Sequence, residues 1–291
     1  MKKLLVTIRF LAIILFSCLL YSTYSLAQDN SIKDFDLGMQ YYLDSNYKKA
    51  AEFIELAAKK DHDKAKFIIA LMYHEGQGVK PDIDRSIYWF KKAAKSGNID
   101  AQYLLGKTYL NKENADKKAF KWTYKAAKGG SIDAQYVLGK MYYNGIGIRE
   151  NYKKAFQWIE KAANQGNAEA QYLLGIYYKE GTGVLANTKT AFHWFEKAAQ
   201  QNNPQALHML GYEYFIGEIV ELDEQKAFIF IGRAANLDHP KAQEMLGILY
   251  ILGIGTEPNL TAAAFWINEA RKNGYPINEE IWNKYELWKY E

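Results

Sequence analysis

The residues of this 291-residue chain that could carry out acid–base chemistry or hold a metal are few and far apart. Histidine-based metal sites usually show two or more ligands at short, recognisable spacings. No such spacing occurs among the five histidines, which are His62, His74, His193, His208 and His239. We therefore expect no metal site, and no other motif indicates a cofactor.

One serine has the spacing of a nucleophile. Ser45-Asn-Tyr-Lys48 matches the Ser-x-x-Lys motif, in which a lysine assists a serine in acyl transfer. A match this short is expected about once by chance in a chain so rich in lysine, and the motifs that accompany it in β-lactam-binding enzymes are missing. Because no base or oxyanion donors can be assembled around Ser45, we expect the protein not to be an enzyme.

The first 27 residues have the three parts of a secretory signal peptide. A basic start is followed by an apolar run at residues 10–20 and by the small residues Ser25 and Ala27. The apolar run is too short to cross a bilayer as an uncleaved helix. We predict cleavage after Ala27 and export to the periplasm or the medium.

A second interpretation of the same segment is a lipoprotein signal. Residues 15–18, Leu-Phe-Ser-Cys, resemble a lipobox, whose cysteine becomes lipidated. Phe16 departs from the small or β-branched residue usual there, and apolar residues continue past Cys18, so a lipid anchor at Cys18 is less favoured. Cys18 is the single cysteine, so cleavage after Ala27 leaves a cysteine-free protein that suits an oxidising compartment.

The composition is that of a folded globular protein. Hydrophobic residues make up 49% of the chain and charged residues 24%, which excludes a disordered or collagen-like chain. The net charge is +4, and Lys2, Lys3 and Arg9 of the signal segment supply three of these charges. Because no basic cluster follows, we expect no nucleic-acid binding.

The chain after this segment is built from one repeated block. Its clearest copies are AQYLLG at 101–106, AQYVLG at 134–139 and AQYLLG at 170–175. Helical spacing of the apolar residues predicts an amphipathic helix, helix A, around each copy. A tyrosine follows three residues after each of the recurring small residues, which are Gly38, Ala70, Gly106, Gly139, Gly175, Gly211 and Gly247.

A second block follows each first one and predicts a second helix, helix B. Its clearest copies are AFKW at 119–122, AFQW at 155–158 and AFHW at 191–194. We interpret its final aromatic residue as a core position, so packing takes precedence over a role in stacking sugars. This aromatic is Phe53, Trp89, Trp122, Trp158, Trp194, Phe230 and Trp266 in the successive repeats.

Residues that tolerate the left-handed conformation separate the helices. Gly-x-Gly follows helix A at 76–78, 145–147, 181–183 and 253–255, where glycine can end the helix. Repeats 1 and 3 have shorter turns without this motif, and Ile219 replaces the second glycine in repeat 6, so we expect these loops to differ. Helix B is expected to end at a left-handed residue, which is Asp61, Gly97, Gly130, Gly166, Asn202, Asp238 and Gly274.

These motifs resemble the Sel1-like repeat, a relative of the tetratricopeptide repeat, over residues 34–274. The resemblance implies an all-α fold, namely a right-handed α-solenoid of about seven helix-turn-helix repeats that are stabilised mainly by their neighbours. Residues 28–33 are expected to form a short linker. Residues 275–291 are expected to form a capping helix.

The capping helix is predicted from its own sequence. Acidic residues stand in its first turn after Asn278, and Ile281, Tyr285 and Trp288 follow with helical spacing. We expect this apolar face to cover repeat 7.

By the same resemblance, helix A lines the concave surface, and a partner would bind there. The inward positions lie three before, and one, four and five after, the small residue. Tyrosine, lysine and asparagine at such positions suit an extended peptide or its carboxylate. The candidate partner-binding residues are Tyr103, Lys107, Tyr136, Lys140, Tyr143, Asn144, Tyr172, Lys179, Tyr212 and Phe215.

Two other interpretations of these positions remain open. Tyr103, Tyr136 and Tyr172 could each pack at the seam with the neighbouring helix A, and Lys107 and Lys140 could be ordinary solvated lysines. Towards the C-terminus the inward positions become apolar, so either the capping helix or a partner should cover them.

We therefore expect an exported, non-catalytic protein-interaction scaffold of the bacterial envelope or secreted fraction, with a protein or peptide partner. The alternative is a cell-wall or β-lactam-directed hydrolase, as in secreted cysteine-rich Sel1-like proteins. That alternative is disfavoured because those proteins carry cysteine pairs in their repeats, whereas this chain has Cys18 alone.

Overall fold

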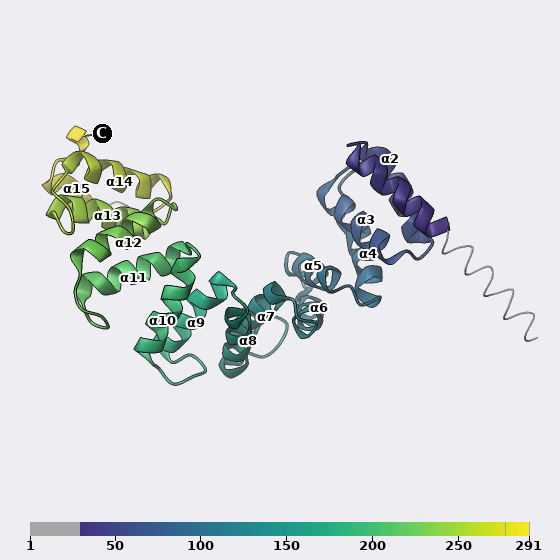
Figure 1. The fold of residues 1–291 in the computed structure, drawn as a ribbon, viewed down its shortest axis with the longest axis horizontal. Coiled ribbons are helices and arrows are strands. Elements are labelled where there is room, and N and C mark those ends of the chain that lie inside the picture. Colours follow the sequence, from purple (N-terminus) through teal and green to yellow (C-terminus); the bar gives the residue numbers. More distant parts are fainter. Residues whose placement is uncertain (1–29, 277, 291) are drawn as a thin grey trace, which may run out of the picture. The chain divides into compact units, whose positions relative to one another are not determined.

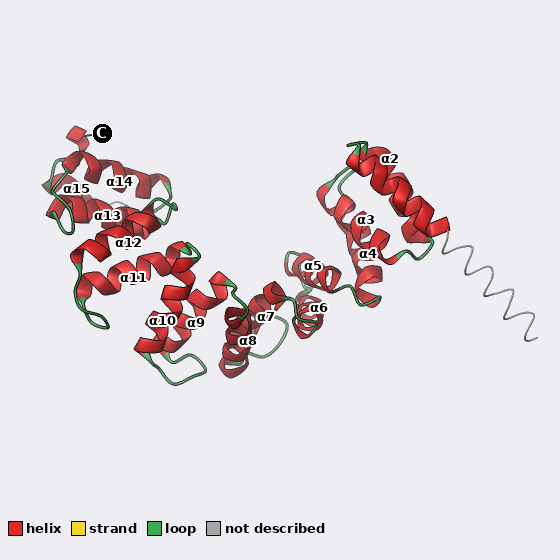
Figure 2. Ribbon diagram, viewed as in Figure 1, coloured by secondary structure: helices red, strands yellow, loops and turns green. Residues whose placement is uncertain are grey.

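The structure is a computed structural model that describes residues 30–276 and 278–290. Every regular element in this part of the chain is helical (Figure 2). None of the helices found there is long and apolar enough to span a bilayer. The predicted signal peptide, with its cleavage site and Cys18, lies outside the described residues.

The chain divides after Ser131 into two compact units, in each of which consecutive helices pair as helix A and helix B (Figure 1). The first unit contains a helix at residues 30–43, then α2 (Tyr47–Lys59), α3 (Asp63–Glu75), α4 (Ile83–Lys95), α5 (Ile99–Leu110) and α6 (Asp116–Lys128). The second contains α7 (Ile132–Asn144), α8 (Tyr152–Asn164), α9 (Ala168–Glu180), α10 (Thr188–Gln200), α11 (Pro204–Ile216), α12 (Glu224–Ala235), α13 (Pro240–Leu252), α14 (Leu260–Lys272), α15 (Glu279–Lys284) and the 3-10 helix η1 (Leu287–Tyr290).

Residues 30–33 belong to the first helix. The expected linker at residues 28–33 is therefore wrong for these four positions. Ser31 is buried, so this stretch already contributes to the packed part of the first repeat.

Side-chain caps begin most of the helices. Asn187 Oδ1 accepts a hydrogen bond from the Thr190 backbone N–H at 3.0 Å, which satisfies a donor that has no partner within the helix. Ala115, before α6, is an exception and makes no side-chain cap. Equivalent caps are made by Asn46, His62, Asp82, Asn98, Asn151, Asn167, Asn203, Asp223, His239 and Asn259.

The predicted ends of helix B are confirmed. All seven residues expected to adopt the left-handed conformation have positive φ, from 56° at Asp238 to 103° at Gly130. In the two short turns without Gly-x-Gly, Ser45 and Asn114 take this conformation instead, with φ of 59° and 55°. Ser45 is therefore an exposed turn residue.

The second glycine of Gly-x-Gly has a packing role that helix termination does not explain. A Cβ on this glycine would overlap the carbonyl of the first residue of helix B in the preceding repeat. The loop of one repeat thus covers the start of helix B in the repeat before it. These contacts are Gly78 on Tyr47, Gly183 on Tyr152 and Gly255 on Glu224.

Within a repeat, the small residue of helix A packs on the residue that follows the aromatic of helix B. A Cβ on Gly139 would lie 2.6 Å from Ile159 Cδ1, and Ile159 is fully buried. Trp158, which precedes Ile159, is only half-buried, as is Trp194. The expected core position of the aromatic is therefore correct for Trp89 and Trp122, which are buried. The closest contact with the small residue of helix A, however, is made by the residue that follows the aromatic.

Buried glutamines join consecutive repeats. Gln171 Nε2 donates to the Ala163 carbonyl near the end of the preceding helix B at 3.2 Å. Its Oε1 accepts a hydrogen bond from Gln201 Nε2 at 2.8 Å. Gln243 makes the same two kinds of contact two repeats later, with the Ala235 carbonyl and with Asn273 Nδ2. Each glutamine thus links the end of the preceding repeat to the end of helix B in its own repeat.

The C-terminal segment forms two short helices, α15 and η1, rather than one. Glu286 interrupts them with a φ of 51°. Because of this break, Trp282 and Leu287 both pack in a buried cluster with Ile251 and Ile267, whereas Trp288 is 46% exposed. The expectation of a single capping helix that presents Trp288 is therefore wrong. Part of the apolar end of repeat 7 is nevertheless covered.

Candidate functional site

A cavity of about 220 Å³ opens beside helix A of repeats 2 and 3, within the first unit. Helix α3 contributes residues one, four and five after Ala70, and α5 contributes residues one and five after Gly106. These are inward positions of the predicted concave surface. The lining residues are Leu71, His74, Glu75, Phe90, Leu104, Lys107, Thr108 and Asn111.

This cavity has an apolar floor and a polar rim. Phe90 is fully buried beneath it, and the His74 ring lies 6.4 Å from the Phe90 ring centroid in an edge-on arrangement. Lys107, Glu75 and the amide of Asn111 supply opposite charges and hydrogen-bonding groups at the exposed edge. The arrangement can take an apolar side chain and bind the polar backbone on either side of it.

Two of the predicted tyrosines are half-buried between helices of the second unit. The Tyr172 ring lies 5.9 Å from the Phe195 ring, and Lys140 Nζ lies 5.2 Å from the centre of the Tyr136 ring. Burial raises the pKa of both tyrosines above its ordinary value. Phe195 belongs to α10 of the same repeat as Tyr172, and Lys140 to the same helix as Tyr136, so these contacts do not involve the neighbouring helix A. Tyr103 on α5 is also half-buried.

Tyr143 is more open to solvent. It is 38% exposed, and its ring stacks on Tyr177 at 5.8 Å and contacts Tyr152 at 5.3 Å. Asn144, the last residue of α7, is exposed next to it. Tyr143 of α7 and Tyr152 of α8 are thus exposed rings beside the buried Tyr177 of α9.

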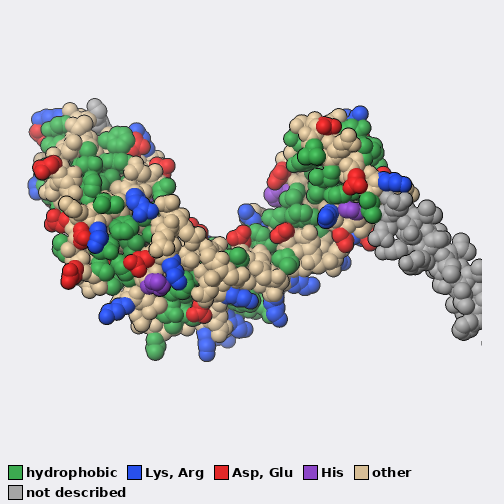
Figure 3. Space-filling model, viewed as in Figure 1, with side chains coloured by type: hydrophobic (Ala, Val, Ile, Leu, Met, Phe, Trp, Pro, Cys, Tyr) green, Lys and Arg blue, Asp and Glu red, His purple; other side chains and the backbone are tan. Residues whose placement is uncertain are grey.

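The remaining predicted positions differ in their accessibility. Lys179 is held in an ion pair with Glu213, so its charge is already matched within the protein. Tyr212 is exposed, whereas Phe215 packs against the core of the second unit. Figure 3 shows hydrophobic side chains gathered over the last helices of that unit.

Two of the histidines, His208 and His239, form a close pair. His208 and His239 stack at 4.8 Å, and burial lowers the pKa of His208 to about 4. His239 Nδ1 accepts a hydrogen bond from the Ala242 backbone N–H, so that imidazole is neutral. No group of three or more potential metal ligands occurs among the described residues.

Helix pairs that stack on their sequence neighbours, with polar and aromatic side chains displayed along helix A, define an α-solenoid of helix-pair repeats. The chain belongs to the Sel1 repeat family, and proteins of this family are generally protein-interaction scaffolds. The family's sequence pattern matches at residues 35–62, 63–98, 99–131, 132–167, 168–203, 204–239 and 240–275.

Solved structures of similar proteins have the same architecture. A Sel1 repeat protein from Oxalobacter formigenes is 28% identical with a TM-score of 0.77, and the match covers 87% of this chain and 75% of that one. A protective antigen of uropathogenic Escherichia coli with the SLR fold is 30% identical with a TM-score of 0.73. That match covers 77% of this chain and 49% of the antigen.

A curated relative matches over a shorter stretch. Chitin synthase regulatory factor 3 of Schizosaccharomyces pombe is 38% identical over 63 residues. The match covers 22% of this chain and 7% of that protein. The chain therefore spans a small part of this relative.

Sequence reasoning found Lys107, and its inward offsets also reach Asn111, but it missed the residues that α3 contributes to the cavity. Leu71, His74 and Glu75 have the same offsets from Ala70 that selected the candidate residues in the middle repeats. The periodic pattern therefore contained the signal. That these positions enclose a cavity with Phe90 depends on packing between repeats.

Proposed function

We propose that this protein is an exported, non-catalytic scaffold that binds an extended segment of a partner protein along helix A. The observation that carries the proposal is the cavity between α3 and α5, because its lining combines an apolar floor with charged and amide groups at the rim. Such a combination suits a peptide whose apolar side chain enters the cavity while its backbone contacts the rim.

The polar rim suggests which segments would bind. Lys107 is exposed and attracts an acidic side chain or a carboxyl terminus, while Asn111 can bond to both groups of a peptide unit. Glu75 disfavours a second acid beside the first. We therefore propose a partner segment with one large apolar residue close to one acidic residue.

The proposal of export is supported by the sequence of the first 27 residues. A periplasmic or secreted location follows from cleavage after Ala27, and a lipid anchor at Cys18 is the less favoured route. The test is N-terminal sequencing of the protein from its own cells. A mature chain starting at Gln28 would support the proposal, an acyl group at Cys18 would indicate export by the lipid-anchor route, and a protein that starts at Met1 would contradict export.

The binding proposal is tested by affinity capture from cell-envelope extract. Leu71→Asp/Lys107→Ala changes the floor and the rim of the cavity, and Lys117→Ala is the matched control on an exposed position of α6. We expect wild type and the control to capture the same protein and the double variant to lose it, with unchanged melting temperatures. Equal capture by all three would contradict the proposed site.

The hydrolase alternative is tested directly. Ser45 is exposed at a turn, and Lys48 is exposed at the start of α2. We expect no hydrolysis of a chromogenic β-lactam beyond the rate of a Ser45→Ala variant. A serine-dependent rate would replace the scaffold proposal with an enzyme.

A further inference from the structure

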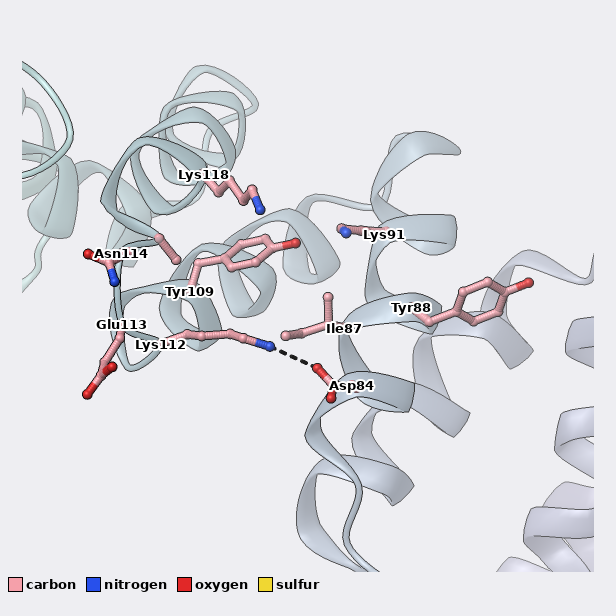
Figure 4. Close-up of a pocket in the computed structure, with 10 residues that line it drawn as sticks. Asp84, Ile87, Tyr88, Lys91, Tyr109, Lys112, Glu113, Asn114 and Lys118 are labelled. Atoms are coloured by element: carbon pink, nitrogen blue, oxygen red, sulfur yellow. Dashed lines mark hydrogen bonds and ion pairs between the residues drawn. The ribbon is translucent and has the colours of Figure 1, made fainter.

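A second cavity, of about 300 Å³, exists because repeat 3 lacks the Gly-x-Gly loop. In repeats 2, 5 and 7 the second glycine of this loop covers the start of helix B in the preceding repeat. The short turn between α5 and α6 has no such glycine, and the first two turns of α4 line an open space instead (Figure 4).

Three helices contribute to the lining. Helix α4 provides Asp84, Ile87, Tyr88 and Lys91, and α5 provides Tyr109. The short turn and α6 provide Lys112, Glu113, Asn114, Ala115 and Lys118. This cavity shares no residue with the one beside helix A, so its occupant need not be the scaffold's partner.

Two ammonium groups converge on one buried ring. Lys91 Nζ lies 5.7 Å and Lys118 Nζ 5.8 Å from the centre of the Tyr109 ring. Figure 4 shows the two lysines reaching towards Tyr109 from α4 and α6. Tyr109 and Ile87 are buried and give the cavity an apolar wall.

The acidic residues of the lining do not neutralise these lysines. Asp84 pairs with Lys112 at 2.8 Å, and this hydrogen-bonded pair lowers the pKa of Asp84 and raises that of Lys112. Glu113 points away from the cavity in Figure 4. Lys91 and Lys118 are therefore the two positive charges beside the apolar wall, and the lining as a whole, with Glu113 counted, has a net charge of +1.

We propose that this cavity binds a small molecule that carries a phosphate dianion on a compact apolar body. Two ammonium groups can neutralise a dianion, and lysine binds phosphate well as a point charge. The apolar wall of Ile87 and Tyr109 accommodates the body of the ligand. The volume is at the lower end of the range for small-molecule sites, which limits the ligand to about the size of one ring with its phosphate.

The test is calorimetric titration of the purified protein with three probes at low ionic strength. Phenyl phosphate carries the dianion and an apolar ring, inorganic phosphate lacks the ring, and 3-phenylpropionate carries a carboxylate in place of the phosphate. We expect phenyl phosphate to bind about tenfold more tightly than either of the others. Equal or tighter binding of 3-phenylpropionate would overturn the phosphate assignment in favour of a carboxylate, such as an acidic peptide side chain.

Two double variants locate the binding. Lys91→Ala/Lys118→Ala removes the converging charges, whereas Lys95→Ala/Lys117→Ala removes the same charge from exposed positions of the same two helices outside the cavity. We expect the first pair to weaken phenyl phosphate binding by about tenfold or more and the second by less than about twofold. All four lysines are exposed, so the melting temperatures should not change. Equal weakening by both pairs, or no binding by wild type, would overturn the proposal.

Discussion

Lys179 Nζ on α9 donates a hydrogen bond at 3.0 Å to Glu213 Oε1 on α11, although the Glu213 side chain is only 1% exposed. Glu213 lies two residues after the small residue of its repeat, where other repeats bury Met141, Tyr177 and Leu249. Its second carboxylate oxygen has no hydrogen-bond partner within the structure. A lysine from the preceding repeat thus compensates a carboxylate at a core position.

Removing Lys179 should therefore destabilise the fold more than an ordinary surface mutation. Lys179→Ala leaves the buried carboxylate uncompensated, and we expect a loss of about 2 kcal/mol, less than for a fully buried pair because Lys179 is partly solvated. Lys179→Ala/Glu213→Met removes both charges and places the residue of repeat 4 at the core position, so most of the loss should be recovered. Urea unfolding of both variants measures this, and equal instability of the two would refute the argument.

Gly175 and Gly232 should respond oppositely to an added side chain. A Cβ on Gly175 would lie 2.6 Å from Phe195 Cδ1 and 3.1 Å from the Ala191 carbonyl, so Gly175→Val should cost about 3 kcal/mol by overpacking. Gly232 lies inside α12 with open space around it, so Gly232→Ala should gain about 1 kcal/mol from helix propensity. Thermal unfolding followed by circular dichroism gives both signs, and normal stability of Gly175→Val would contradict the helix pairing.

The glutamine contacts between repeats predict a compensating pair of mutations. Repeat 6 has Leu207 at the glutamine position, and Arg233 Nη2 donates at 3.3 Å to the Ala199 carbonyl that a glutamine would otherwise bind. Gln171→Leu should therefore cost about 1 kcal/mol, because it removes the glutamine donor from the Ala163 carbonyl, which keeps the Gly166 N–H, and the acceptor of Gln201 Nε2.

Lys197 occupies in repeat 5 the position that Arg233 has in repeat 6. Adding Lys197→Arg to Gln171→Leu should restore part of the lost stability, whereas Lys197→Arg alone should have little effect. A double variant no more stable than Gln171→Leu in chemical denaturation would show that the arginine does not replace the glutamine.

The stability of the second unit should fall in mild acid. The pKa of His208 is about 4 in the folded protein, below its ordinary value of 6.5, because the ring is buried. Between these values the unfolded chain binds the additional proton, so the stabilisation is complete above pH 6.5 and is lost as the pH falls towards 4. We expect a loss on the order of 2 kcal/mol over this window.

His208→Tyr introduces the residue found at this position in the middle repeats and should flatten the pH dependence. The exposed His193 provides the control, since His193→Gln copies repeat 4 and should leave the dependence unchanged. Unfolding measured from pH 7 to pH 4.5 gives the comparison. An unchanged slope in His208→Tyr would assign the acid sensitivity to other groups, such as His239.

The repeat order, the helix pairs and the left-handed ends of helix B could be predicted because they depend on local sequence. Apolar spacing selects the helices, and Asp61, Asn202 and Asp238 tolerate the left-handed conformation as the glycines do. The caps that begin the helices could have been found by the same periodicity. Asn151, Asn187 and Asn259 each stand one residue before a helix B.

The candidate site was only partly accessible from the sequence. The spacing from the small residue of each repeat selected a set of inward positions, among them Lys107, which lines the cavity. It could not separate Lys179, which is held by Glu213, from Tyr143, which remains exposed. These differences in accessibility arise from side chains of the next repeat, so they cannot be predicted from a residue's position within its own repeat.

The sequence by itself determined that this chain is a series of Sel1 repeats, because each repeat encodes its own helices and turns. The tertiary structure decided that Ile159, and not Trp158, fills the contact with Gly139, since one residue rotates a side chain by about 100° around a helix. It also decided that the short turn of repeat 3 leaves a basic cavity at Tyr109. Both results depend on how neighbouring backbones approach each other, which a repeat pattern does not specify.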